Sequence, residues 1–286
     1  IPATLYLAYH QTAMLTLINE IHSPCFPKIQ AFVEKSGKVL TTYNRNRWLF
    51  WVMLTIVALV SGAVQTHLTK PGMGISGDSV HYLQGAENLV NGKGYVLHIA
   101  EGDPEPITGF EPAYSMLIAI GIHLGSTAEH AARILNLVLF CLSIVLTGWI
   151  IFQITGKVMP AFLGSSFLVM APNTMSIFAW VMSEPLFIVL LLAIILAWYR
   201  YIQTPTAWKA FLVGVFSAFM MATRLAGAVF LPPLAITMLM IKKQRFEKRV
   251  RDVFIFGFTS ILAPGAFLIR NRLVTPSSPP SEAGPL

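Results

Sequence analysis

The feature that most constrains the fold is a series of apolar segments, each near the length of a bilayer-spanning helix. Such a helix needs about 20 mainly apolar residues. Only 12% of the residues are charged, about half the share in soluble domains, which argues strongly against a soluble enzyme. The sequence therefore predicts an all-α, polytopic helical membrane protein. The clearest predicted spans are residues 48–64, 134–154, 185–202, 207–221 (short), 225–241 and 253–269.

Two further apolar segments are ambiguous. Residues 113–124 are short for a full span, and residues 158–181 are interrupted by Pro172 and Asn173. The second segment forms either one long kinked helix or a span followed by a half-helix. Irregular backbone at membrane depth is tolerated only against protein or a water-filled cavity, so the second alternative places Pro172 near a cavity.

The charges are sorted along the chain. Residues 28–47 hold five basic side chains and residues 242–251 hold six, whereas residues 70–111 hold six acids and two lysines. Under the positive-inside rule both basic clusters are cytoplasmic, and residues 242–251 also attract anionic membrane lipids. The net charge of +7 thus reflects orientation in a membrane and does not indicate nucleic-acid binding. Alternating spans then place five polar residues on the outer face: Asp78, Glu111, Glu184, Arg224 and Arg270.

This pattern divides the chain into three parts. Residues 1–47 form an N-terminal cytoplasmic or peripheral segment, and residues 48–272 form the transmembrane domain, with an outer loop at 65–112. Residues 273–286 are a tail rich in Pro and Ser, typical of irregular structure. We expect a multi-pass protein of the bacterial inner membrane.

The outer loop contains a predicted amphipathic helix that lies along the membrane surface. Gly92 suits the end of this helix. Asp78 stands at its start, where Asp is a favoured N-cap, and a carboxylate there can also meet a lipid head group. His81 and Tyr82 line the same site in one interpretation; in the other, Tyr82 is an interfacial anchor. The apolar face of the helix is predicted to consist of Val80, Leu83, Ala86 and Val90.

These motifs resemble the GT-C glycosyltransferases, in particular their protein-mannosyltransferase and aminoarabinose-transferase branch. The resemblance covers about residues 47–272 and depends on the order of the motifs among the spans. The outer loop opens with Gly77-Asp78-x-x-x-Tyr82, followed by Ala86-x-x-Leu89 and Gly92-x-Gly94-Tyr95. Later motifs are Phe-Glu-Pro-Ala-Tyr at 110–114, Ala-Ala-Arg at 131–133, Met-Ser-Glu-Pro-Leu at 182–186, Ala-Thr-Arg-Leu-Ala-Gly at 222–227 and Arg-Asn at 270–271.

The resemblance implies transfer of a sugar from a polyprenyl-phosphate donor to an acceptor on the outer face, with Asp78 as the catalytic base. Arg224 and Arg270 are candidates to bind the leaving phosphate, because a guanidinium matches phosphate oxygens. Glu184 would orient an arginine, assist Asp78 or help to hold a divalent cation. A divalent cation is the one possible cofactor. The members of these families usually carry more spans and a soluble outer domain, so we expect an N-terminal portion.

Other interpretations of the same residues remain open. Arg224 and Arg270 could extend to lipid head groups, Glu184 could be a first-turn acid favoured by the helix dipole, and Glu111 could be a surface acid. The alternative function is a non-catalytic scaffold or lipid-binding subunit of a larger membrane complex. A transporter is least favoured, because it predicts paired charges within the spans.

Overall fold

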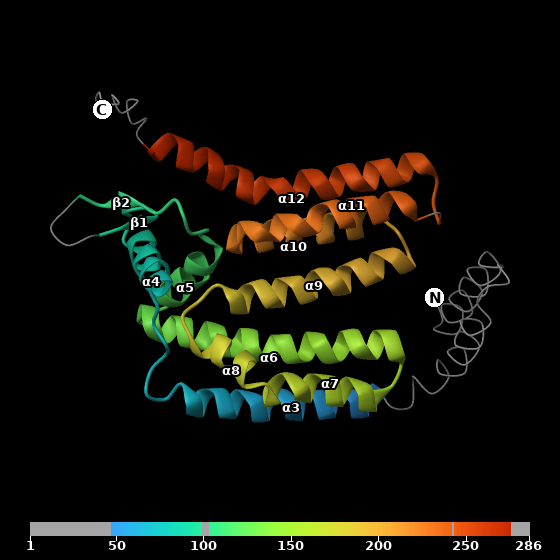
Figure 1. The fold of residues 1–286 in the computed structure, drawn as a ribbon, viewed down its shortest axis with the longest axis horizontal. Coiled ribbons are helices and arrows are strands. Elements are labelled where there is room, and N and C mark those ends of the chain that lie inside the picture. The colour runs from blue at the N-terminus through green and yellow to red at the C-terminus, as the bar shows by residue number, and fades with distance from the viewer. Residues whose placement is uncertain (1–46, 99–102, 242, 276–286) are drawn as a thin grey trace, which may run out of the picture.

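A computed structural model describes residues 47–98, 103–241 and 243–275. Across these residues the chain forms a row of roughly antiparallel helices with a small hairpin at one end (Figure 1). The predicted N-terminal segment, apart from Arg47, and the tail from residue 276 onward lie outside the described residues. The first basic cluster lies mostly outside them as well.

Within the described residues, four helices are long and apolar enough to cross a membrane. They are α3 (Arg47–Leu68), α6 (Ala128–Thr155), α9 (Glu184–Gln203) and α12 (Phe246–Val274). A bent pair, α7 (Val158–Met170) and α8 (Pro172–Ala179), is a fifth candidate. The chain is thus an integral, multi-pass, all-α membrane protein, as the apolar segments predict.

Several predicted spans have different bounds or geometry in the structure. The predicted break in residues 158–181 is confirmed, because α7 and α8 meet at an angle of 64°. The helix α10 (Ala207–Thr223) has 17 residues, about 25 Å, which is short for a hydrocarbon core of about 30 Å. The prediction of one regular helix at 225–241 is wrong. A 3₁₀ segment, η1 (Leu225–Phe230), precedes α11 (Leu231–Met240), whose first turn contains two prolines.

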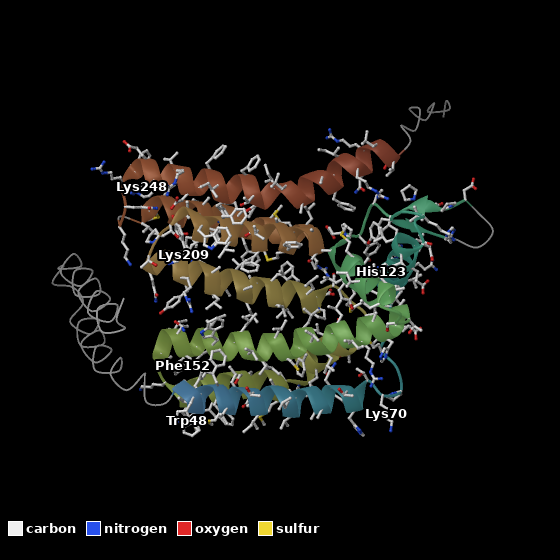
Figure 2. All side chains as sticks on the ribbon, turned by 180° about the vertical axis from the view of Figure 1, so that it is seen from behind. Trp48, Lys70, His123, Phe152, Lys209 and Lys248 are labelled. Atoms are coloured by element: carbon white, nitrogen blue, oxygen red, sulfur yellow. The ribbon has the colours of Figure 1, made fainter. Side chains whose placement is uncertain are left out.

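The remaining elements gather at one end of the bundle. They are α4 (Gly77–Val90), the two-stranded hairpin of β1 (Val96–Leu97) and β2 (Glu105–Pro106), and α5 (Ala113–His123). We call this the site end (Figure 1). The opposite end, which we call the basic end, carries Lys209 and Lys248 (Figure 2). The helices therefore alternate in direction as predicted from the charges.

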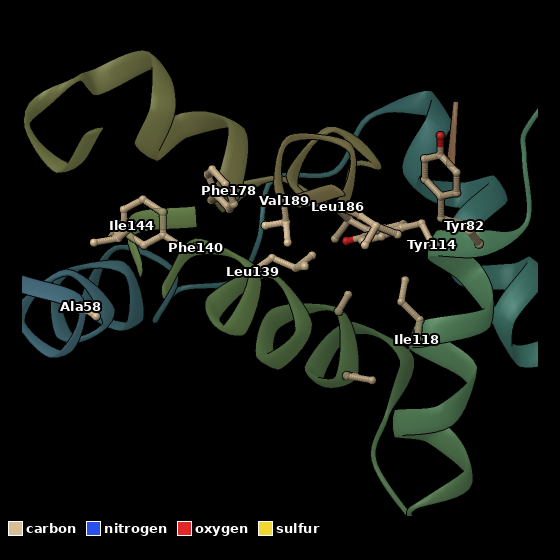
Figure 3. Close-up of a cluster of buried hydrophobic side chains, with 14 of the residues drawn as sticks. Ala58, Tyr82, Tyr114, Ile118, Leu139, Phe140, Ile144, Phe178, Leu186 and Val189 are labelled. Carbon is tan, nitrogen blue, oxygen red and sulfur yellow. The ribbon is translucent and has the colours of Figure 1, made fainter. Parts of the chain in front are cut away.

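Two apolar cores hold the helices together. The larger core joins α3, α5, α6 and α8 to the first half of α9, with Phe140, Phe178 and Leu186 among its buried side chains (Figure 3). The second core lies between α9, α10, α11 and α12 and contains Met220 and Phe256. Large apolar side chains on the outward faces of α3 and α12 are exposed, as lipid-facing positions require.

Residues 180–183, which connect α8 to α9, are irregular backbone within the bundle; we call them the linker. The buried side chain of Asn136 on α6 donates to the carbonyl oxygens of Phe178, at 3.3 Å, and Trp180, at 2.7 Å. The hydroxyl of Tyr114 donates to Oδ1 of Asn136 at 2.9 Å. These bonds satisfy backbone groups that a helix would otherwise pair, which is the condition for irregular structure at this depth.

The close packing of α10 against α12 gives a first prediction. A methyl group added at Gly214 would lie 2.8 Å from the carbonyl oxygen of Phe256 and would also overlap Thr259. We expect Gly214→Ala to destabilise the protein by about 1–3 kcal/mol, as overpacking does. Thermal unfolding in detergent measures the effect.

The control is Gly257→Ala, on α12, where an added methyl group meets no atom within 4 Å. This variant should keep or raise the unfolding temperature, because alanine favours a helix by about 1 kcal/mol over glycine. Equal behaviour of the two variants would contradict the packing between α10 and α12.

Candidate functional site

The start of α4 is fixed by two serines. Ser76 is the N-cap, and its backbone N–H donates to Oγ of Ser79 at 2.8 Å as part of a capping box. The prediction that Asp78 caps the helix is therefore wrong. Asp78 lies in the first turn and is exposed, where the helix dipole still favours its negative charge. At the other end of the helix, Gly92 has a φ of +71°, which confirms the predicted helix end.

The face of α4 that is buried against the protein includes polar side chains and shares only Ala86 with the predicted apolar face. Of the predicted apolar face, Ala86 is buried, but Val80 and Val90 are exposed. The buried face consists of Ser79, Tyr82, Gly85, Ala86 and Asn88. The polar members are buried because they bond to other parts of the chain: Asn88 donates to the carbonyl oxygen of Val96, and two others bond to the linker.

Four hydrogen bonds hold residues 179–183 against α4 and against Gly74, which lies just before this helix. The backbone of Gly74 donates to Ala179 and accepts from Val181, both at 2.9 Å. Ser79 Oγ donates to the carbonyl oxygen of Val181 at 2.7 Å, and the Tyr82 hydroxyl donates to Ser183 Oγ at 3.0 Å. The start of α9 is thereby placed directly beside α4.

Glu184, the first residue of α9, forms an ion pair with Arg224 at the C-terminal end of α10. Both side chains are partly exposed. The Glu184 oxygen Oε2 is buried and has no hydrogen-bond partner among the described residues. Glu184 was predicted to orient an arginine, to assist Asp78 or to help hold a divalent cation. The ion pair with Arg224 agrees with the first of these roles.

Tyr82 lies within electrostatic reach of three charged side chains. Its own side chain is 4% exposed, so the interpretation of Tyr82 as an interfacial anchor is wrong; its ring packs edge-on against Tyr114 at 5.2 Å (Figure 3). Burial raises the pKa of Tyr82, and the charges of Arg224, Glu184 and Asp78 act on the same hydroxyl. The structure therefore brings together side chains from α4, α9 and the end of α10.

Phe110 and Glu111, which lie just before α5, contact α4 and the backbone that follows α10. The Phe110 ring stacks on His81 at 4.3 Å, and Nδ1 of His81 lies 3.1 Å from the carbonyl oxygen of Gly77. Glu111 Oε1 accepts a hydrogen bond from the backbone N–H of Leu225 at 2.8 Å. Glu111 is thus more than a surface acid, because it fixes the backbone directly after Arg224.

Arg270, on α12, holds the hairpin. Its guanidinium donates to the carbonyl oxygen of Tyr95 at 2.6 Å and to that of Ile107 at 2.7 Å. It also lies 5.8 Å from the centre of the Tyr95 ring. The adjacent Asn271 donates to Thr108 at 3.1 Å. Arg270 therefore reaches the site end as predicted, but two of its donors already bind backbone oxygens.

Metal-binding residues are not clustered in the described part of the chain: no three His, Cys, Asp or Glu side chains there are placed to hold one ion. The possible divalent cation stays a prediction. No protein-family model matches the sequence, and no curated protein is significantly similar to it.

The docking of α4 on the linker gives a second prediction. Ser79→Ala removes a fully buried hydroxyl that accepts from Ser76 and donates to Val181. We expect a loss of about 1–3 kcal/mol, because a buried carbonyl oxygen is left without a donor. Amide hydrogen exchange of α4 should become faster.

The matched control is Val80→Ala, the next residue on the same helix, whose side chain is exposed. It should leave the exchange of α4 almost unchanged. If Ser79→Ala gave the same protection as the wild type, the contact between α4 and the linker would not hold this end of the bundle together.

Proposed function

We propose that the protein is a membrane glycosyltransferase of the GT-C type, which transfers a sugar from a polyprenyl-phosphate donor. One observation carries the proposal: the exposed Asp78 carboxylate and the Glu184–Arg224 ion pair, which come from three separate elements, all act electrostatically on the hydroxyl of Tyr82 at the site end. Each of these three charged residues lies in one of the motifs that resemble those families. In this proposal the site end faces the outside of a bacterial inner membrane.

Asp78 is the proposed general base. An exposed carboxylate on a surface helix can accept the proton of an acceptor hydroxyl or amine as that atom attacks the sugar. The new bond forms at the anomeric carbon, and the bond from that carbon to the carrier phosphate oxygen breaks. The electron pair of that bond stays with the phosphate, which then needs a positive partner.

Arg224 is the proposed partner of the leaving phosphate. One terminal nitrogen of its guanidinium binds Glu184, and its side chain is 41% exposed. The remaining donors have no acceptor among the described residues and suit the oxygens of a phosphate. Glu184 acts here as a positioning residue, since it holds one side of the guanidinium. Glu111 and Arg270 position the backbone around the site.

The third prediction concerns the base. Asp78→Asn keeps the size of the side chain but removes most of its basicity, and we expect at least about a hundredfold lower turnover. Reconstituted full-length protein is incubated with polyprenyl-phosphate hexose and pentose donors, and release of polyprenyl phosphate is measured. Glu87→Gln, an exposed acid on the same helix, is the control. Unchanged turnover in Asp78→Asn would remove Asp78 from the mechanism.

The fourth prediction separates the two arginines. Arg224→Gln should lower kcat by about a hundredfold or more, as loss of a charge-stabilising donor does, without unfolding the bundle. Arg270→Gln should instead speed amide exchange in the hairpin, because its two carbonyl contacts are lost. The reverse assignment of these effects would make Arg270 the phosphate ligand.

A second candidate function is a non-catalytic subunit that binds lipid or supports a larger membrane complex. It is favoured by the protein contacts that already engage Glu184, Glu111 and Arg270. Under this alternative, Asp78→Asn and Arg224→Gln would leave partner binding intact in membrane extracts, and no donor would be consumed by the wild type.

A further inference from the structure

The cations of the basic end differ in what they bind. Lys209 and Lys243 donate to carbonyl oxygens at the C-terminal end of α9, at 2.9–3.3 Å. Arg249 donates to the carbonyl oxygen of Leu239 at 2.8 Å, and Arg251 pairs with the buried Asp252 at 2.8 Å. These four cations are accounted for by the fold, because they satisfy carbonyl groups at helix ends or neutralise a buried acid.

Arg245 and Lys248 are different. Both are exposed, and the described part of the chain offers neither side chain a hydrogen-bond or ion-pair partner. They lie at the start of α12, whose first turn holds one acid, Glu247. Positive charge is unfavourable there, because the N-terminal end of a helix carries partial positive charge. An anion from outside the described fold would offset this cost.

An exposed apolar stripe begins directly after Arg245. Phe246, Val250, Phe254 and Phe258 are 63%, 44%, 71% and 54% exposed, and their spacing of four residues places them on neighbouring turns of one face. The helix has 29 residues, about 44 Å, which exceeds a hydrocarbon core of about 30 Å. The first turns of α12 therefore reach the level of the head groups.

We propose that this corner, made of Arg245, Lys248 and the stripe from Phe246 to Phe258, binds an anionic phospholipid of the leaflet at the basic end. The phosphate lies between these two cations, and one acyl chain follows the apolar stripe. Charge selects the occupant, since two cations with no protein partner favour a lipid with net negative charge over a zwitterionic one. The site is separate from the proposed glycosyltransferase site at the opposite end.

The test measures lipid adducts on the detergent-solubilised full chain by native mass spectrometry. Dioleoylphosphatidylglycerol should bind more tightly than dioleoylphosphatidylcholine. The double variant Arg245→Gln, Lys248→Gln should bind phosphatidylglycerol about fivefold more weakly for each charge removed. The phosphatidylcholine affinity should not change. Phe254→Ser should also weaken phosphatidylglycerol binding, although no charge is lost.

Lys70→Gln is the matched control, since Lys70 is an exposed lysine at the other end of the bundle (Figure 2). It should bind phosphatidylglycerol as the wild type does. The proposal is overturned if Lys70→Gln loses as much affinity as the double variant, or if the double variant binds normally. It is also overturned if soluble glycerol phosphate displaces the lipid at equal concentration, because the corner would then bind phosphate without an acyl chain.

Discussion

The structure depends on one constraint, that backbone polar groups inside a membrane bundle must find partners within the protein. Regular helices meet this constraint by themselves, but the bend between α7 and α8 and the linker before α9 do not. Asn136 from α6, together with Gly74 and Ser79 from the segment around the start of α4, supplies the missing partners. The same bonds fix the first residue of α9, so the position of Glu184, and with it Arg224, depends on this interruption.

The apolar pattern predicts most of the helical architecture, but not the irregular start of the segment at 225–241. Apolar length identified the four long helices, and the sorting of charge predicted which helix ends lie together. Pro172 and Asn173 mark the break between α7 and α8. The two prolines at the start of α11 carry a similar signal, because proline is favoured in a first turn and restricts the residue before it. The 3₁₀ segment before α11 nevertheless escaped prediction.

The charged residues of the candidate site could be predicted from the sequence, but the residues that position them could not. Asp78, Glu184 and Arg224 stood out because charges are scarce in this chain. Their supporting residues did not stand out, since a serine or asparagine within an apolar segment gives no sign of its partner. The spacing of Ser76 and Ser79 was the one usable signal, because a cap is often followed by a polar residue three positions later. The burial of Tyr82 is not predictable for a related reason, since its hydroxyl bonds to Ser183, about 100 residues away.

That long separation bears on biosynthesis. The hydrogen bond from Ser79 to Val181 spans 102 residues, and a ribosome adding 5–20 residues per second needs about 5–20 s to produce them. During that interval α4 has left the ribosome but the linker on which it docks has not yet been made. The segment that contains α4 must therefore remain undocked until α9 is made. An insertion machinery that delays or misorders the later helices would leave this end of the protein unassembled, even with α3 correctly placed.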